Sequence, residues 1–136
     1  ARFSDEVSIN PMNIQKKTIV DRLHRNREYR PPWLWSLVKM IQESHHDITE
    51  SGCRVIVHPT AGGKVRGAHN CGKCDKEVVA AIERYSVSKE LDEFSSLRCD
   101  CKSVWSDEIS SDISSPVQFG TGMTRRGNVL RSLHAP

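Results

Sequence analysis

The fold is decided by the stretch His69-Asn70-Cys71-Gly72-Lys73-Cys74-Asp75, together with Cys99-Asp100-Cys101 further along the chain. The two cysteine pairs are separated by 24 residues, and folding can bring four such sulfurs around one structural zinc ion. Gly72 permits a tight turn between the first two sulfurs, and a helix that follows Cys74 would place its positive end beside the thiolates. We therefore predict one Zn²⁺ ion bound by Cys71, Cys74, Cys99 and Cys101.

Other ligand sets remain open. Alternate residues of a strand point to opposite faces, so the backbone has to turn before Cys99 and Cys101 can reach one ion. His69 is the alternative fourth ligand, in a set of three cysteines and one histidine. Cys53 and His58 flank a predicted strand and can form a further pair, although a buried free thiol is the favoured interpretation of Cys53. A secreted, disulfide-linked protein is the third possibility, but five cysteines would leave one unpaired.

The length and composition of the chain limit the kinds of protein it can be. It has 136 residues, which allows one domain, and only 6% of them are aromatic, so a metal ion would supply stability that a small core lacks. No apolar run reaches the roughly 18 residues of a membrane span, and we expect a soluble protein in the cytoplasm or nucleus, without a membrane partner. Neither an initiator methionine nor a signal peptide opens the sequence, so we expect a processed product or a fragment.

Hydrophobic periodicity predicts an α+β fold that is mainly helical. The best strand covers residues 54–58; residues 61–64 form a turn, and residues 65–68 return as the second strand of a short β-hairpin. Residues 97–105 should be extended or turned. The predicted helices cover residues 10–27, 33–46, 75–87 and 88–94.

The ends of the chain differ from its middle. Residues 1–9 are expected to be a flexible segment, and residues 10–105 one zinc-binding domain. Residues 106–136 are rich in serine and glycine and poor in large apolar side chains, so we predict a disordered tail. The serines among its acidic residues are plausible phosphorylation sites.

Charge is zoned along the sequence, although the net charge is only +3. Residues 1–40 carry eight lysines and arginines against four acids, and residues 77–112 carry nine acids against four bases. Such zones suit an anionic partner, for which RNA is favoured over DNA, although ordinary solvated faces give the same pattern. The predicted nucleic-acid contacts are Lys16, Lys17, Arg22, Arg25, Lys64, Arg66, Lys73 and Lys76, with Arg27, Arg30, Arg125, Arg126 and Arg131 as further basic residues.

A tryptophan-rich helix offers a second kind of interface. Trp33 and Trp35 stand at the start of the helix predicted over residues 33–46. They predict a protein partner or a homodimer, because tryptophan is a common binding anchor. Packing into the core is the alternative interpretation.

Catalytic templates are absent from the sequence. There is no His-Glu-x-x-His, no Gly-x-Ser-x-Gly and no complete phosphate loop, and no His-x-Glu precedes Cys71-x-x-Cys74 as in zinc deaminases. We therefore predict a non-enzyme: a zinc-binding regulatory protein that binds RNA through basic residues around the cysteines. The alternative is a zinc-stabilised adaptor or homodimer, as in viral accessory proteins that act on host factors.

Overall fold

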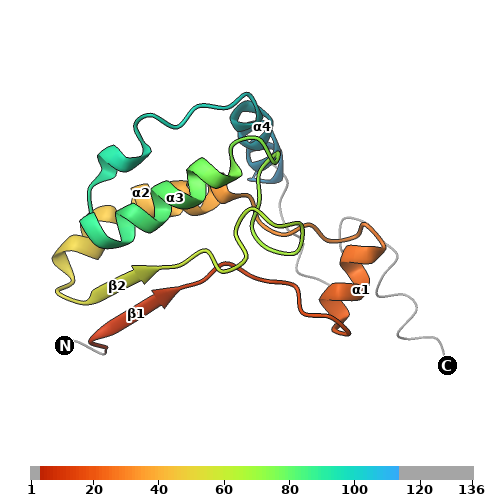
Figure 1. The fold of residues 1–136 in the computed structure, drawn as a ribbon, viewed down its shortest axis with the longest axis horizontal. Helices are drawn as coiled ribbons and strands as arrows, with labels where there is room; N and C mark the ends of the chain where they lie inside the picture. Colours follow the sequence, from red (N-terminus) through yellow and green to blue (C-terminus); the bar gives the residue numbers. More distant parts are fainter. Residues whose placement is uncertain (1–3, 114–136) are drawn as a thin grey trace. The chain divides into compact units, whose positions relative to one another are not determined.

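Helices and strands are interspersed along residues 4–113, the part of the chain that the computed structural model describes (Figure 1). The order is β1 (Glu6–Ile9), α1 (Ile19–Arg25), α2 (Leu34–Glu50), β2 (Arg54–Val57), α3 (Asp75–Ser88), the 3-10 helix η1 (Leu91–Phe94) and α4 (Cys101–Ile113). The chain divides into two units, residues 1–102 and 103–136, so α4 begins at the end of the first unit and continues in the second. The predicted α+β class is confirmed. None of the described helices is long and apolar enough to cross a membrane.

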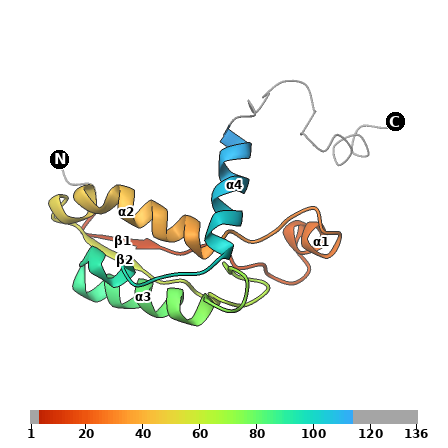
Figure 2. The same ribbon diagram turned by 90° about the horizontal axis from the view of Figure 1, so that it is seen from above.

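The two strands form a parallel pair. β1 runs beside β2 with Glu6 opposite Arg54 and each following residue in register (Figure 1). On the other edge of β2, α3 satisfies one backbone donor, because the Val57 N–H donates to the Ser86 hydroxyl at 2.7 Å. In Figure 2 the strand pair lies between α2 and α3. The sheet is therefore covered by helices, as parallel strands require.

The pairing differs from the predicted β-hairpin. Residues 65–68 are not a strand but part of a tight loop, in which the Gly67 N–H donates to the Lys64 carbonyl at 2.9 Å. A Cβ atom on Gly67 would lie 2.2 Å from the Ala61 carbonyl oxygen, so only glycine fits this closure. The partner of β2 comes instead from residues 6–9, which we expected to be flexible. Val7 and Ile9 alternate with polar residues there, but a run of only four residues carries a weak local signal for a strand.

The core lies on the helix faces that the periodicity predicts. Tyr85 is fully buried; its ring centroid lies 5.4 Å from that of Phe94 in η1, and its hydroxyl lies 3.0 Å from Nδ1 of His45 in α2. This side chain therefore links three helices. The buried faces include Leu34, Leu37, Val38 and Ile41 of α2 and Val78, Ala81, Ile82 and Tyr85 of α3.

The first helix is shorter than predicted. α1 begins at Ile19 and not at Asn10, because Thr18 caps it: the Thr18 hydroxyl accepts a hydrogen bond from the Asp21 N–H at 3.1 Å. The Asp21 carboxylate is buried and lies 2.7 Å from a guanidinium nitrogen of Arg66. This ion pair ties α1 to the loop that follows β2.

The last described helix falls where an extended segment and then a tail were expected. Ser110 and Ser111 donate from their hydroxyls to the carbonyls of Ser106 and Asp107, each at 2.8 Å. Serines that suggest a tail by composition thus bond to the backbone within α4. The remainder of the predicted tail, residues 114–136 with Arg125, Arg126 and Arg131, lies outside the described residues, and the domain boundaries at residues 10 and 105 stay predictions.

Truncating the core should show which helix face holds the fold. Ile82→Ala removes a side chain that is 0% exposed, and we expect a loss of about 2–5 kcal/mol in the free energy of unfolding, measured by urea denaturation. Ile19→Ala truncates a side chain that is 70% exposed and should change that free energy by no more than about 0.5 kcal/mol. Equal losses in the two variants would contradict the core described above.

Candidate metal centre

Four cysteine sulfurs gather where the loop before α3 meets the start of α4. The Sγ atoms of Cys71, Cys74, Cys99 and Cys101 all lie within 4.8 Å of one another. Cys71 and Cys99 are 3.6 Å apart, and Cys74 and Cys101 are 3.7 Å apart. Sulfurs placed tetrahedrally at about 2.3 Å from one ion would be about 3.8 Å apart, whereas a disulfide joins its sulfurs at about 2.05 Å. The four thiols are free, and their spacing fits a single metal ion.

The backbone turns each pair of sulfurs to one side. Gly72 has a φ of 89°, in the left-handed region that favours glycine, and its N–H donates to the Asp75 carboxylate at 2.7 Å. The same carboxylate accepts from the Asn70 N–H at 2.8 Å, so one buried acid holds both arms of the loop. In the second pair, the Lys102 N–H donates to the Cys99 carbonyl at 3.0 Å. This is the turn that two cysteines separated by a single residue require.

Two side-chain donors lie behind the sulfurs. Nδ2 of Asn70 is 3.4 Å from Sγ of Cys74, and Nε1 of Trp35 is 3.2 Å from Sγ of Cys101. Oδ1 of Asn70 also accepts from the Trp35 backbone N–H at 3.3 Å, at the start of α2. Such donors favour the thiolate form and fix the orientation of metal ligands. The sequence predicts neither role: Trp35 is assigned there to a partner interface, and the position of Asn70 next to Cys71 is the one signal for Asn70.

The thiols differ in their environment. The backbone N–H groups of Lys73 and Cys74 lower the pKa of Cys71 to about 7. Burial raises the pKa of Cys74 to about 12 and also raises the pKa of Cys101. Of these thiols, the exposed Cys71 therefore loses its proton most readily. A bound cation supplies the charge that keeps a buried sulfur such as Cys74 deprotonated.

The other predicted ligands lie apart from this cluster. Nδ1 of His69 is 2.9 Å from the Gly67 carbonyl oxygen, and the Cys53 thiol donates to the Ser4 carbonyl at 3.3 Å. Among residues 4–113, the close group contains four cysteines and neither His69, Cys53 nor His58. The arrangement favours the four-cysteine set over the set that includes His69.

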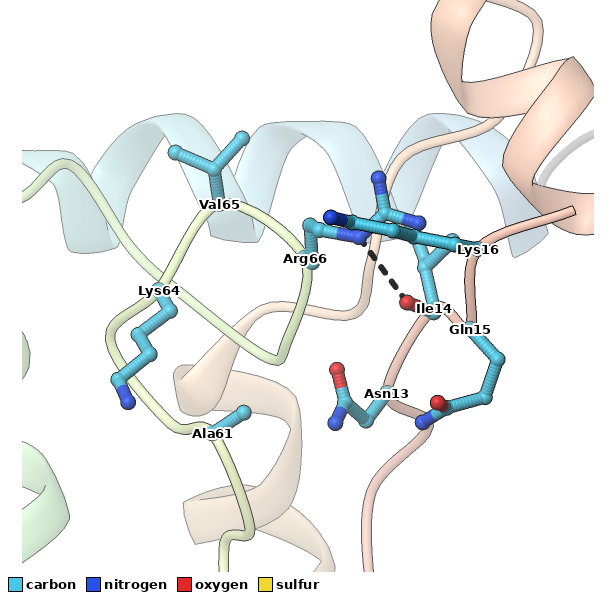
Figure 3. A pocket seen from close by; sticks show the side chains of 8 residues that line it. All are labelled: Asn13, Ile14, Gln15, Lys16, Ala61, Lys64, Val65 and Arg66. Carbon is cyan, nitrogen blue, oxygen red and sulfur yellow. Dashed lines mark hydrogen bonds between the residues drawn. The ribbon is translucent and has the colours of Figure 1, made fainter.

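The predicted RNA contacts are spread over several elements. Lys16, Lys64 and Arg66 line one pocket, between the segment that precedes α1 and the loop that follows β2 (Figure 3). Lys17, Arg22 and Arg25 line a second hollow at α1. Lys73 and Lys76 instead belong to the metal-binding loop and to α3.

The tryptophans predicted to bind a partner lie in different settings. Trp35 is 1% exposed, so it has no surface left for a partner, and its role is core packing and the hydrogen bond to Cys101. Trp33 is half-buried, and the guanidinium carbon of Arg30 lies 3.8 Å from its ring centroid. Trp35 is therefore not part of the expected docking surface, because α2 directs this side chain into the core.

Comparison with known proteins finds archaeal relatives. The chain is 34% identical to archaeosine synthase subunit beta of Methanosarcina acetivorans, over 77% of this chain and 30% of the relative. It is 35% identical to archaeosine synthase subunit beta of Thermococcus kodakarensis, over 76% of this chain and 32% of the relative. An uncharacterized protein of Methanocaldococcus jannaschii is 28% identical over 84% of this chain and 31% of the relative.

The match has a defined extent. The chain spans about a third of the length of these curated relatives, 30% to 32%. A continuous stretch of 105 residues in a chain of 136 must include residues 32–105, so the similarity to the Methanosarcina protein extends over all four cysteines. No family model and no solved structure matches the chain.

These relatives overturn the function predicted from sequence. The prediction of a regulatory protein, or of a viral accessory protein, is wrong, because the named relatives are subunits of an archaeal synthase. Charge zones and a serine-rich end suggested the regulatory role, and such composition does not distinguish a regulator from part of an enzyme. Archaeal relatives also give no support to the expected nuclear location.

Cobalt titration tests the metal centre directly. We expect the metal-free protein to bind one Co²⁺ ion per chain, with the visible absorption bands of tetrahedral thiolate coordination. Cys74→Ser should abolish these bands, because it removes one of the four clustered sulfurs. Cys53→Ser is the matched control and should leave the spectrum unchanged; equal loss in both variants would contradict the four-cysteine assignment.

Proposed function

We propose that this chain is a region of an archaeosine-forming enzyme that modifies transfer RNA. The observation that carries the proposal is the 34% and 35% identity to two proteins named archaeosine synthase subunit beta. Since the chain spans 30% and 32% of those proteins, the activity would belong to the whole subunit and to the second subunit that the name implies. That name favours a different subunit over a second copy of this chain as protein partner. A role on transfer RNA also favours the cytoplasm as its location.

We propose zinc as the metal of the cysteine cluster. Four thiolates are soft ligands, and zinc takes four such ligands in the tetrahedral arrangement to which the separations of 3.6 Å and 3.7 Å are suited. Zinc with four protein ligands has no open position for water or substrate, so its role would be structural. Asn70 and Trp35 would orient Cys74 and Cys101 toward the ion through their N–H donors.

The contribution of this chain to the enzyme would then be binding and support. A closed centre of four cysteines supplies no reacting group, and the predicted absence of catalytic residues from this chain is consistent with that role. The basic residues predicted to contact RNA would serve to hold transfer RNA, while the reacting groups would belong to the rest of the enzyme.

Replacing a segment of the Thermococcus kodakarensis protein would test the function. The segment matched by this chain is exchanged for this chain, and archaeosine is measured by mass spectrometry of digested transfer RNA. We expect the chimera to form archaeosine, and the same chimera with Cys74→Ser to lose most of this activity. The control is the relative's own segment rejoined at the same junctions; if that control is active and an equally abundant, soluble chimera is not, the proposal fails.

Metal removal tests zinc and its structural role. Elemental analysis of the purified protein should give one zinc per chain, and chelation should unfold most of the first unit, seen as loss of helical circular dichroism. The free energy of binding a structural zinc ion is about 10–16 kcal/mol. The net stability of a typical domain is about 5–15 kcal/mol, so losing the metal can remove all of it. A protein that keeps its thermal transition after complete removal of zinc would contradict this role.

A further inference from the structure

The pocket beside α1 is formed by two segments that are distant in the sequence. One wall is the segment before α1, with Asn13, Gln15 and Lys16; the other is the loop after β2, with Lys64 and Arg66 (Figure 3). The volume of the pocket is about 560 Å³, within the range of small-ligand sites. It lies apart from the cysteine cluster, whose residues do not line it.

The two walls are fixed to one another by hydrogen bonds. The Ile14 N–H donates to the Arg66 carbonyl at 2.8 Å, and Nε of Arg66 donates to the Ile14 carbonyl at 3.0 Å. A second guanidinium nitrogen of Arg66 lies 2.7 Å from Oδ1 of Asp21, whose side chain is only 7% exposed. The Lys17 N–H donates to the other oxygen of that carboxylate at 2.9 Å. The pocket is therefore preformed, and Arg66 serves to hold its shape.

The charge that remains at the surface belongs to the lysines. Asp21 pairs with Arg66 and lies 3.4 Å from a nitrogen of Arg25. Its negative charge therefore offsets part of the positive charge that these two arginines could offer to a ligand. Within residues 4–113, Lys16 and Lys64 are exposed and make no ion pair. The segments 13–30 and 60–73 together carry nine lysines and arginines against two acids, whereas the whole chain has a net charge of +3. Positive potential is thus concentrated on this part of the first unit.

A second basic hollow follows directly along the chain. It is lined by Lys17, Thr18, Ile19, Arg22 and Arg25, so adjacent residues, Lys16 and Lys17, belong to neighbouring hollows. Two neighbouring basic hollows suit a ligand with repeated negative charges, such as a sugar-phosphate backbone. The side-chain amides of Asn13 and Gln15 offer donors and acceptors for phosphate oxygens and ribose hydroxyls.

We infer that this pocket and the adjoining face of α1 bind the sugar-phosphate backbone of transfer RNA. The inference rests on the proposed function and specifies the surface that makes the contact. Lys16 and Lys64 contact phosphates from opposite walls, Arg22 extends the contact along α1, and Arg66 keeps the walls in place. Such contacts position the RNA without reading its sequence.

The test compares two double variants that lose the same charge. Lys16→Gln with Lys64→Gln removes the pocket lysines, and Lys39→Gln with Arg54→Gln removes two exposed bases from α2 and β2. Dissociation constants for an unmodified transfer RNA transcript are measured by fluorescence anisotropy at several salt concentrations. Each lost phosphate contact should reduce the slope of log K against log salt by about 0.7–0.9, so the pocket variant should lose roughly 1.4–1.8. Its affinity at low salt should fall by about tenfold or more.

The outcomes separate the two proposals. Thermal melting shows whether each variant keeps the wild-type fold. If the pocket double variant melts at a lower temperature than wild type, Lys16→Gln and Lys64→Gln are measured as single variants, and each should show about half of the change in salt slope. If wild-type protein binds transfer RNA and the pocket variant binds equally well, or if the control pair weakens binding as much, the pocket is excluded while the function stands. If wild-type protein binds no transfer RNA, or binds only anionic phospholipid vesicles, the proposed binding surface is excluded, and formation of archaeosine by the chimera decides the function separately.

Discussion

The gathering of four cysteine sulfurs constrains the elements nearest to it. Cys74 directly precedes α3, and Cys101 is the first residue of α4. Asn70 extends the constraint to the start of α2, because it bonds both the Cys74 sulfur and the Trp35 backbone. The loop before α3 and the start of α4 are thus held together, although their paired cysteines stand 27 and 28 positions apart in the sequence. Hydrogen bonds of Asn70, Trp35 and Asp75 connect the sulfurs to the loop and to α2, so the cluster and these residues form one cooperative unit.

Buried carboxylates perform a related task at two places in the first unit. Asp75 bonds two backbone N–H groups of the cysteine loop, and Asp21 bonds Arg66 and a backbone N–H beside α1. Each acid is 5% exposed or less, and each satisfies its charge with fixed donors, the condition under which a buried carboxylate is tolerated. The Arg66 guanidinium, together with the Lys17 N–H, holds the pKa of Asp21 below its ordinary value. The buried carboxylates of this domain therefore stabilise loops rather than helices.

Local patterns in the sequence predict the parts of this fold that depend on local physics. The apolar faces of α2 and α3 follow from residue spacing, and the four cysteines follow from ligand chemistry. The sequence does not predict the partner of β2, because pairing with residues 6–9 depends on contacts across the fold. Val7 and Ile9 alternate with polar residues, but an alternation over four residues is too short to identify a strand. α1 begins later than predicted because the hydrogen bond between Thr18 and Asp21 sets the start of the helix. In the sequence, Pro11 is also a typical start signal, so the sequence predicts the earlier start. The role of Asn70 cannot be predicted from the sequence, because a hydrogen bond to sulfur has no sequence signature.

The parallel pairing of β1 with β2 has a consequence for the order of folding. Glu6 pairs with Arg54, and closing so long a stretch of chain costs roughly 3 kcal/mol of conformational entropy before any strand contact forms. β2, by contrast, follows α2 closely along the chain and is bonded by α3 through Ser86. We expect α2, β2 and α3 to assemble first and β1 to dock last, on an edge that is already built. The N-terminal strand therefore completes the fold rather than nucleating it.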